Sequence, residues 1–382
     1  MHHLLRLTRA LLLGLIAAVA AIVPATASAH ASQVAGHVYV DDNTAGTNTI
    51  AAFDRQADGT LTPVPGSPFA AGGAGTGGGL ASQGAVQIAG DGRYLLAVDA
   101  GSNQISVLQI RRGGDLRLVD VVSSGGRGPV SVAEHAGLVY VANSGNGGAN
   151  YTGFRLTPEG QLRPLHGSTV ALPDGSQPGD VLFNSTGANL VGTRVGSSEI
   201  DSFAVGRNGL LTAAPGSPFP AQGLGPFGSE FRPTNPSQLF VSNAHNTATD
   251  SGTVSAFDVA GNGALTSIGD SPFADGQMAP CWVEISHDGS FLFTVNTASG
   301  SISRYSIADD GSLTLLGSTP VSSQAGVGAV DARLSPDGGT LFVDDSRIDA
   351  ISTFDVDGGS LTEVGSPTAL PAGATPAGLA VN

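Results

Sequence analysis

Residues 335–362 read SPDGGTLFVDDSRIDAISTFDVDGGSLT and contain most of one structural repeat. A Pro-Asp-Gly turn at 336–338 precedes the apolar segment 341–343, which ends in two aspartates. The alternating segment 350–356 follows, and a second glycine turn leads to the phrase Gly-Ser-Leu-Thr around Leu361. Period-2 alternation bounded by Gly, Asn and Asp turns is typical of β-strands. With the strand that ends at the first turn, the unit has four short strands.

The phrase Gly-x-Leu-Thr, sometimes degraded, recurs along the whole chain. Its leucines are Leu61, Leu116, Leu162, Leu211, Leu265, Leu313 and Leu361. Successive leucines are 46 to 55 residues apart, and no unit contains a convincing amphipathic helix. A four-stranded repeat of about 50 residues has the length of a propeller blade. The sequence therefore predicts an all-β fold, a seven-bladed β-propeller of four-stranded antiparallel blades, with no room for a second domain.

The two ends of the chain complement each other. Residues 376–382 resemble the innermost strand of a blade, but the chain stops there. Residues 36–43 resemble a second strand that no innermost strand precedes. We expect the N- and C-terminal strands to share one blade, which closes the ring and removes the sheet edges.

The first thirty residues have the order of a secretory signal peptide. Arg6 and Arg9 supply a positive start, residues 10–23 are apolar, and small residues follow. The apolar run is shorter than the roughly 20 residues that a membrane-spanning helix needs. We expect residues 1–31 to be a signal peptide cut after Ala29 or Ala31, and residues 32–382 to be the propeller. The mature protein is then secreted or periplasmic, without membrane insertion.

The composition supports this fold and excludes some partners. The chain has 56 Gly and 22 Pro, which suit a turn-rich β-protein better than helices. The formal net charge is −15, and there is no lysine. Such an acidic surface repels nucleic acid, so we expect no nucleic-acid partner. Cys281 is the only cysteine, so the fold is expected to be stable without an internal disulfide.

The repeat resembles a known family. Apolar strands ending in Asn or Asp, the Gly-x-Leu-Thr phrase, Gly-Ser-Pro-Phe at 66–69 and Ser-Pro-Asp-Gly at 335–338 are together similar to the lactonase family. This family of seven-bladed propellers includes bacterial 6-phosphogluconolactonases and fungal carboxy-muconate lactonizing enzymes. The resemblance covers residues 35–382 and implies a secreted bacterial member that hydrolyses a lactone.

The chain departs from the motifs that catalytic members of this family commonly show. Those members have Gly-Pro-Arg-His at the start of an innermost strand and Asn-Glu at the end of a second strand. The corresponding positions here read APCW at 279–282 and GAVD at 328–331, and no second strand ends in Asn-Glu. The resemblance therefore assigns no catalytic residue to a position of this chain.

Candidate site residues emerge when the innermost strands are aligned on their turns. Glu230, Glu284 and Arg333 then fall in one layer around the channel, with Asp331 and Trp282 in the layer above. Two carboxylates beside a guanidinium can orient and deprotonate a water and stabilise an oxyanion, which suits hydrolysis of a lactone. The alternative is a set of buried ion pairs that neutralise one another.

Other candidates lie near the same channel. Asp180 shares the upper layer, Arg194 would place a positive charge on the rim, and His245 would be a general base or an exposed loop residue. The pairs Asp41-Asp42 and Asp344-Asp345 offer hard oxygen ligands for calcium, although they lack the spacing of a known calcium loop. No zinc, phosphate or nucleophile motif is present, so no other cofactor is expected.

Three functions remain open. The first is a lactonase-like hydrolase of a small unphosphorylated lactone, with water activated by Glu284 or Glu230 and charge stabilised by Arg333. The alternative is a non-catalytic propeller that binds a small, carbohydrate-derived or other ligand, or a protein partner, through the rim of its channel. A calcium-dependent esterase-like site built from the acidic rim is a third possibility.

Overall fold

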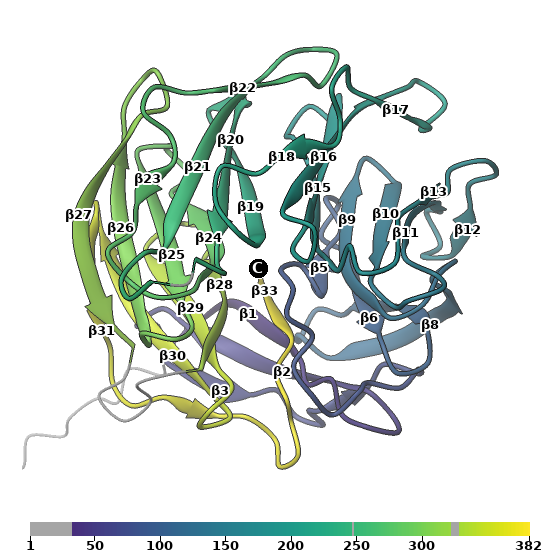
Figure 1. Ribbon diagram of the computed structural model, residues 1–382. Coiled ribbons are helices and arrows are strands. Elements are labelled where there is room, and N and C mark those ends of the chain that lie inside the picture. The colour runs from purple at the N-terminus through teal and green to yellow at the C-terminus, as the bar shows by residue number, and fades with distance from the viewer. Residues whose placement is uncertain (1–32, 247, 322–327) are drawn as a thin grey trace, which may run out of the picture. The chain divides into compact units, whose positions relative to one another are not determined.

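The computed structural model describes residues 33–246, 248–321 and 328–382. All regular elements in this part of the chain are strands, and they form seven antiparallel sheets around a central channel (Figure 1). The predicted seven-bladed β-propeller is confirmed. The signal peptide predicted for residues 1–31 lies outside the described residues. No helix that could span a membrane is found among the residues that are described.

Each blade has four strands in sequence from the channel outward, and all neighbours are antiparallel. The innermost strands are β33 (Gly378–Val381), β5 (Val86–Ile88), β9 (Pro129–His135), β14 (Pro178–Phe183), β19 (Pro226–Arg232), β24 (Pro280–Ile285) and β28 (Ala329–Leu334). The second strands are β1 (Val34–Asp41), β6 (Tyr94–Asp99), β10 (Leu138–Asn143), β15 (Asn189–Arg194), β20 (Asn235–Asn243), β25 (Phe291–Asn296) and β29 (Thr340–Asp345). We number the blades 1 to 7 in this order.

The third and outer strands complete the blades. The third strands are β2 (Thr49–Gln56), β7 (Gln104–Ile110), β11 (Asn150–Leu156), β16 (Glu199–Val205), β21 (Thr253–Val259), β26 (Ser301–Ile307) and β30 (Ala350–Asp357). The outer strands are β3 (Leu61–Pro63), β8 (Leu116–Ser123), β12 (Leu162–Pro164), β17 (Leu211–Ala213), β22 (Leu265–Ser267), β27 (Leu313–Pro320) and β31 (Ser360–Glu363). Five blades add a two-residue strand beside the third strand: β4 (Phe69–Ala70), β13 (Val170–Ala171), β18 (Phe219–Pro220), β23 (Phe273–Ala274) and β32 (Thr368–Ala369). The repeated leucine begins the outer strand in six blades and is its second residue in blade 7.

Blade 1 is built from both ends of the chain. β33 pairs with β1 in the register Val38↔Val381 to Asp41↔Gly378. Further backbone hydrogen bonds extend the pairing at both ends. His37 and Asn382 each donate to the carbonyl of the other (3.2 and 3.0 Å), and Ala377 N donates to the carbonyl of Asp41 (3.0 Å). The predicted closure of the ring is therefore confirmed.

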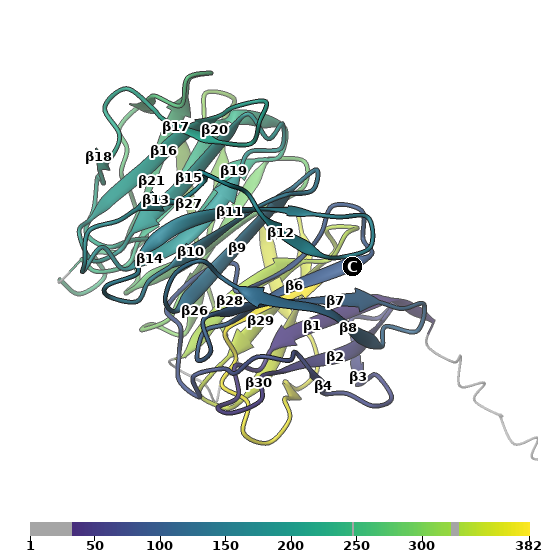
Figure 2. The ribbon, with the colours of Figure 1, turned by 90° about the vertical axis from the view of Figure 1, so that its right-hand side faces the viewer.

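Alternate residues of a strand pack against different neighbouring blades. In β1, Val40 lies in a cluster with Phe342 and Ile351 of blade 7, whereas Tyr39 lies in a cluster with Leu95 of blade 2. Figures 1 and 2 both show β1 and β2, in purple, beside β29 and β30 in yellow-green. Because each strand contributes to two interfaces, the apolar core is distributed between the blades, and the channel is left to the innermost strands.

The closing strand can be tested directly. Leu379 is fully buried between blades 1 and 7, so Leu379→Ala is expected to lower the free energy of unfolding by about 2–5 kcal/mol. Deletion of residues 377–382, which removes the whole pairing, should lower the melting temperature further. Leu315→Ala on β27, where the leucine is exposed, is the control and should change stability by less than about 0.5 kcal/mol. An unchanged melting temperature in the deletion would contradict closure by β33.

Candidate functional site

A cavity of about 640 Å³ opens at the rim of the channel, where innermost strands begin and second strands end. We call this cavity the funnel. It is lined by Gly79, Leu80, Ala81, Ser82, Phe227, His245, Ala279, Cys281, Trp282, Thr297, Ala298, Gly328, Val330, Ser346, Arg347, Pro376 and Ala377. The lining is mainly apolar, and it contains no carboxylate among the described residues.

Backbone bulges shape the funnel wall. In five blades the pairing of the innermost with the second strand shifts near the rim. In blade 6 the shift lies between Pro280 and Trp282, and Cys281 and Trp282 both line the funnel although they are consecutive. A bulge re-aims side chains in this way because one extra residue breaks the alternation of the strand.

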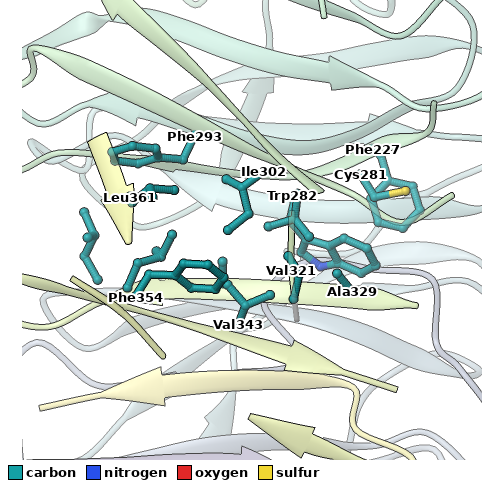
Figure 3. Packing of buried hydrophobic residues seen from close by; sticks show 14 of the residues in the cluster. Phe227, Cys281, Trp282, Phe293, Ile302, Val321, Ala329, Val343, Phe354 and Leu361 are labelled. Atoms are coloured by element: carbon teal, nitrogen blue, oxygen red, sulfur yellow. The ribbon is translucent and has the colours of Figure 1, made fainter. Parts of the chain in front are cut away.

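Trp282 forms part of the funnel floor. Its ring packs edge-on against Phe227, with centroids 5.1 Å apart and planes at 64°. Both residues belong to one buried apolar cluster with Cys281 and Ala329 (Figure 3). The indole Nε1 donates a hydrogen bond to the carbonyl of Ser82 (2.9 Å).

Residues 80–83, which we call the plug, run from blade 1 to blade 2 and cross the channel. The Gln83 side-chain amide donates to the carbonyls of Ser229 (3.0 Å) and Val283 (3.3 Å), and its oxygen accepts from Val283 N (3.0 Å). The Gln83 backbone N donates to the carbonyl of Gly179 (2.9 Å). Four hydrogen bonds thus fix this buried residue to blades 4, 5 and 6. The plug was not among the features predicted from the sequence.

Most polar side chains of the funnel already use their donors within the protein. The hydroxyl of Thr297 donates to the carbonyl of Ala329 (3.0 Å), and that of Ser346 donates to the carbonyl of Gly328 (3.0 Å). Burial raises the pKa of Cys281 to about 12, so its thiol stays protonated at neutral pH and is a poor nucleophile. The funnel therefore offers apolar surface with few available hydrogen-bonding groups.

His245 and Arg347 are the two exceptions in the funnel. Both are exposed residues that follow a second strand, in blades 5 and 7. Within the described part of the chain, no side-chain hydrogen bond or ion pair occupies either of them. His245 lies on the rim, as predicted; Arg347 was not among the predicted site residues.

A second cavity of about 430 Å³ adjoins the funnel. We call it the side pocket, and it shares Leu80, Ala81, Phe227 and His245 with the funnel. Its other lining residues are Ser144, Gly145, Asn146, Gln177, Pro178 and Val195. The side pocket thus adds neutral hydrogen-bonding groups that the funnel lacks.

The predicted charged layer lies on the other side of the plug. Arg333 Nη1 is 3.2 Å from Glu284 Oε2 and 3.7 Å from Asp331 Oδ1. Glu284 Oε1 also accepts from the backbone N of Leu334 (3.1 Å). Ser82 lines the funnel, whereas Gln83 lines a smaller cavity of about 180 Å³ together with Asp180 and Arg333. The plug therefore separates the funnel from the charged residues.

Glu230 completes the layer, as the alignment of innermost strands predicts. Burial and the neighbouring Glu284 raise the pKa of Glu230 well above its ordinary value. Asp180 accepts hydrogen bonds from Ser131 Oγ (3.2 Å) and Ser229 Oγ (2.6 Å), and burial raises the pKa of Asp180 to about 7. The layer is thus a set of buried carboxyls with raised pKa values around one guanidinium, and its catalytic role remains a prediction.

Arg194 does not present its charge to the channel rim. Its guanidinium is buried and binds Asp201 with two hydrogen bonds of 2.6 Å, Nε to Oδ2 and Nη2 to Oδ1. In four other blades the residue at the end of the second strand is hydrogen-bonded to the residue seven positions later: Asp41 to Asn48, Asp99 to Ser106, Asn143 to Asn150 and Asn296 to Ser303. Arg194 and Asp201 occupy the same two positions, so their pair replaces a polar contact of the repeat.

If the Arg194–Asp201 pair replaces a contact of the repeat, a second substitution at Asp201 should restore the stability that is lost when Arg194 is replaced. Arg194→Asn leaves the Asp201 carboxylate buried without its charge partner and is expected to lower the free energy of unfolding by about 3 kcal/mol. The double variant Arg194→Asn with Asp201→Ser introduces the neutral Asn–Ser pair that blade 6 has at Asn296 and Ser303, and it should recover most of the loss in a denaturant titration. Arg93→Asn, which breaks an exposed ion pair with Asp91, is the control. A double variant no more stable than Arg194→Asn would contradict the repeat contact.

The acidic residues considered for calcium are buried at the ends of two second strands. Burial raises the pKa of Asp42 to about 7, and burial and the nearby Asp331 raise that of Asp344 well above its ordinary value. Both carboxylate oxygens of Asp344 lack a hydrogen-bond partner among the described residues. Within those residues, no group of three or more His, Cys, Asp or Glu side chains is placed to hold a metal ion. The raised pKa values favour protonated carboxyls here.

Raised pKa values predict that stability falls as pH rises. Asp42 and Asp180 titrate near pH 7 in the folded state but near 4 in an unfolded chain. Each therefore contributes stability that is complete below about pH 4 and lost as pH rises through 7, on the order of 2 kcal/mol between pH 5 and 8. Denaturant titrations at both pH values should show this decrease, and Asp42→Asn should reduce it. Stability that increases towards pH 8 would contradict protonation; an increase caused by added calcium at pH 8 would favour a cation site.

This propeller matches the model of a known protein family. The family model "Lactonase, 7-bladed beta-propeller" matches residues 46–173 and 231–380. The chain belongs to the lactonase family. The resemblance inferred from the repeat is therefore confirmed. The unmatched residues 174–230 contain blade 4 and most of β19 in blade 5, and with them Arg194 and Glu230.

Several solved structures share the fold of this lactonase-family chain. A Bacteroides uniformis protein provisionally assigned as a 6-phosphogluconolactonase is 19% identical, with a TM-score of 0.71 over 92% of this chain and 100% of its own. The periplasmic gluconolactonase PpgL of Pseudomonas aeruginosa is 18% identical, with a TM-score of 0.70 over 91% of this chain and 98% of its own. At such identities the likeness shows the fold alone. No curated protein matches the chain significantly.

Proposed function

We propose that this lactonase-family propeller is a binding protein that holds a small, mainly apolar molecule in the funnel. The observation that carries the proposal is the plug: hydrogen bonds of Gln83 to blades 4, 5 and 6 separate the funnel from Glu284 and Arg333. A molecule in the funnel therefore contacts Trp282 and Phe227, and it does not reach the carboxylates. The funnel volume of about 640 Å³ is in the range of small-molecule sites.

Lactone hydrolysis is the second candidate, because one feature of the charged layer favours it. Glu230 keeps a raised pKa beside the Glu284–Arg333 ion pair, as a general acid or base needs. An unphosphorylated lactone would then react in the smaller cavity that Arg333 lines, with Arg333 stabilising the developing negative charge. The names of the Bacteroides and Pseudomonas relatives agree with this chemistry. Export, based on residues 1–31, is part of both proposals.

Two measurements on the same protein test the proposals. Trp282 is the only tryptophan of the chain and lies in the funnel floor, so its fluorescence should respond to a bound molecule. We expect saturable fluorescence changes with apolar lactones or esters, and no proton release above buffer from a panel of unphosphorylated lactones.

Matched variants separate the two functions. His245→Gln changes the funnel and should alter binding, whereas Glu230→Gln and Glu284→Gln lie beyond the plug and should leave binding within about twofold. Proton release that disappears in Glu230→Gln or Glu284→Gln would establish the hydrolase instead and overturn the binding role as the main function. A search for a protein partner at the rim follows if neither fluorescence nor proton release responds.

A further inference from the structure

We propose that the funnel and the side pocket together bind an amphipathic molecule, with an apolar chain in the funnel and a compact, uncharged, hydrogen-bonding head such as an acylated lactone in the side pocket. This inference rests on the proposed binding function and specifies its ligand. It differs from a sugar lactone, which carries hydroxyl groups on nearly every carbon.

The two cavities adjoin and share part of their lining. Leu80 and Ala81 of the plug, together with Phe227 and His245, line both the funnel and the side pocket. These four residues therefore lie at the boundary, and in the proposed complex a molecule longer than the funnel extends past them into the side pocket. His245 is exposed, and no side-chain partner among the described residues occupies its ring, so it can donate to or accept from a group at this boundary.

The chemical character of the lining changes at the boundary. On the funnel side, Thr297 and Ser346 already donate their hydroxyl hydrogens to backbone carbonyls, and the Trp282 N–H donates to Ser82. On the other side, Asn146 and Gln177 are exposed amides on the wall of the side pocket. The Asn146 side-chain oxygen accepts from Gly175 N (3.2 Å), which holds the amide in place and leaves its NH₂ group as a donor.

This contrast decides between ligand classes. A polyhydroxylated lactone in the funnel would leave most of its hydroxyls facing apolar groups, and every buried hydroxyl without a partner costs binding free energy. An acyl chain has no such groups and gains affinity with each methylene that it buries. A neutral lactone or amide head offers carbonyl acceptors, which match the amide donors of Asn146 and Gln177. The exposed Arg347 at the funnel wall contributes little, because water screens its charge.

The test measures binding through the fluorescence of Trp282. The probes are N-acyl homoserine lactones with acyl chains of 4, 6, 8 and 10 carbons, δ-gluconolactone, and decanoic acid. We expect the dissociation constant of the acyl lactones to fall by up to about fourfold for each methylene until the funnel is full, and δ-gluconolactone to bind far more weakly than the ten-carbon probe. A dissociation constant independent of chain length, or tighter binding of δ-gluconolactone, would overturn the inference.

Two variants assign the parts of the ligand to the two cavities. Ala298→Asp places a charge on the exposed funnel wall and should weaken the ten-carbon lactone and decanoic acid at least tenfold; Ala171→Asp, on the exposed edge strand β13, is the control and should change neither. Asn146→Ala should weaken the acyl lactone about two- to tenfold, the value of one hydrogen bond, and leave decanoic acid unchanged. Equal effects of Asn146→Ala on both probes would refute a head in the side pocket.

The outcomes also separate this inference from the function on which it rests. If no probe changes the fluorescence of Trp282, binding in the funnel itself is wrong. If the probes bind but chain length and Asn146→Ala have no effect, the funnel is a binding site and only the amphipathic ligand is wrong.

Discussion

The pairing of β33 with β1 is the contact on which the arrangement of the whole ring depends. It joins the two ends of the described chain within one blade, so that every blade has a neighbour on both sides. Apolar side chains can then alternate between two interfaces along each strand, as Tyr39 and Val40 do in β1. The seven innermost strands consequently converge on a channel whose walls carry the polar and charged side chains that no interface accommodates.

That channel explains both the plug and the unusual carboxyls. A ring of innermost strands presents backbone carbonyls and amides near its axis, and buried backbone groups need partners. Gln83 supplies donors and an acceptor to three blades at once, and its neighbour Ser82 accepts the indole N–H of Trp282. Below the plug, the carboxyls of Asp180, Glu230 and Glu284 interact with a single guanidinium, that of Arg333. Because the three carboxyls are buried, their pKa values are raised.

The apolar funnel and the charged layer therefore lie on opposite sides of Gln83. The funnel wall is mainly apolar, and the hydroxyls of Thr297 and Ser346 are already hydrogen-bonded, which leaves His245 and Arg347 as its available polar side chains among the described residues. The departure from the family's Gly-Pro-Arg-His and Asn-Glu motifs agrees with this. Cys281 and Trp282 stand in the APCW segment, where they enlarge the apolar lining instead of supplying an acid or a base.

The sequence by itself determined the blades, their number, the closing pair and the layer of Glu230, Glu284 and Arg333. The blades and the layer follow from period-2 alternation and from turns within about 50 residues, which are local properties of the chain. The closing pair is a contact between the two ends, and it was predictable because residues 36–43 and 376–382 each supply the strand that the other lacks. Only the tertiary structure decided the plug, because Gln83 meets Ser229 and Val283 from 146 and 200 residues away. The spacing of the repeated leucines gave one weak indication of an insertion: the interval from Leu61 to Leu116, which contains the plug, is the longest of the six. The sequence also could not predict the orientation of Arg194, because its buried partner Asp201 sets where the guanidinium points. Nor could it predict the apolar wall of the funnel, because a backbone bulge in blade 6 turns Cys281 and Trp282 towards it.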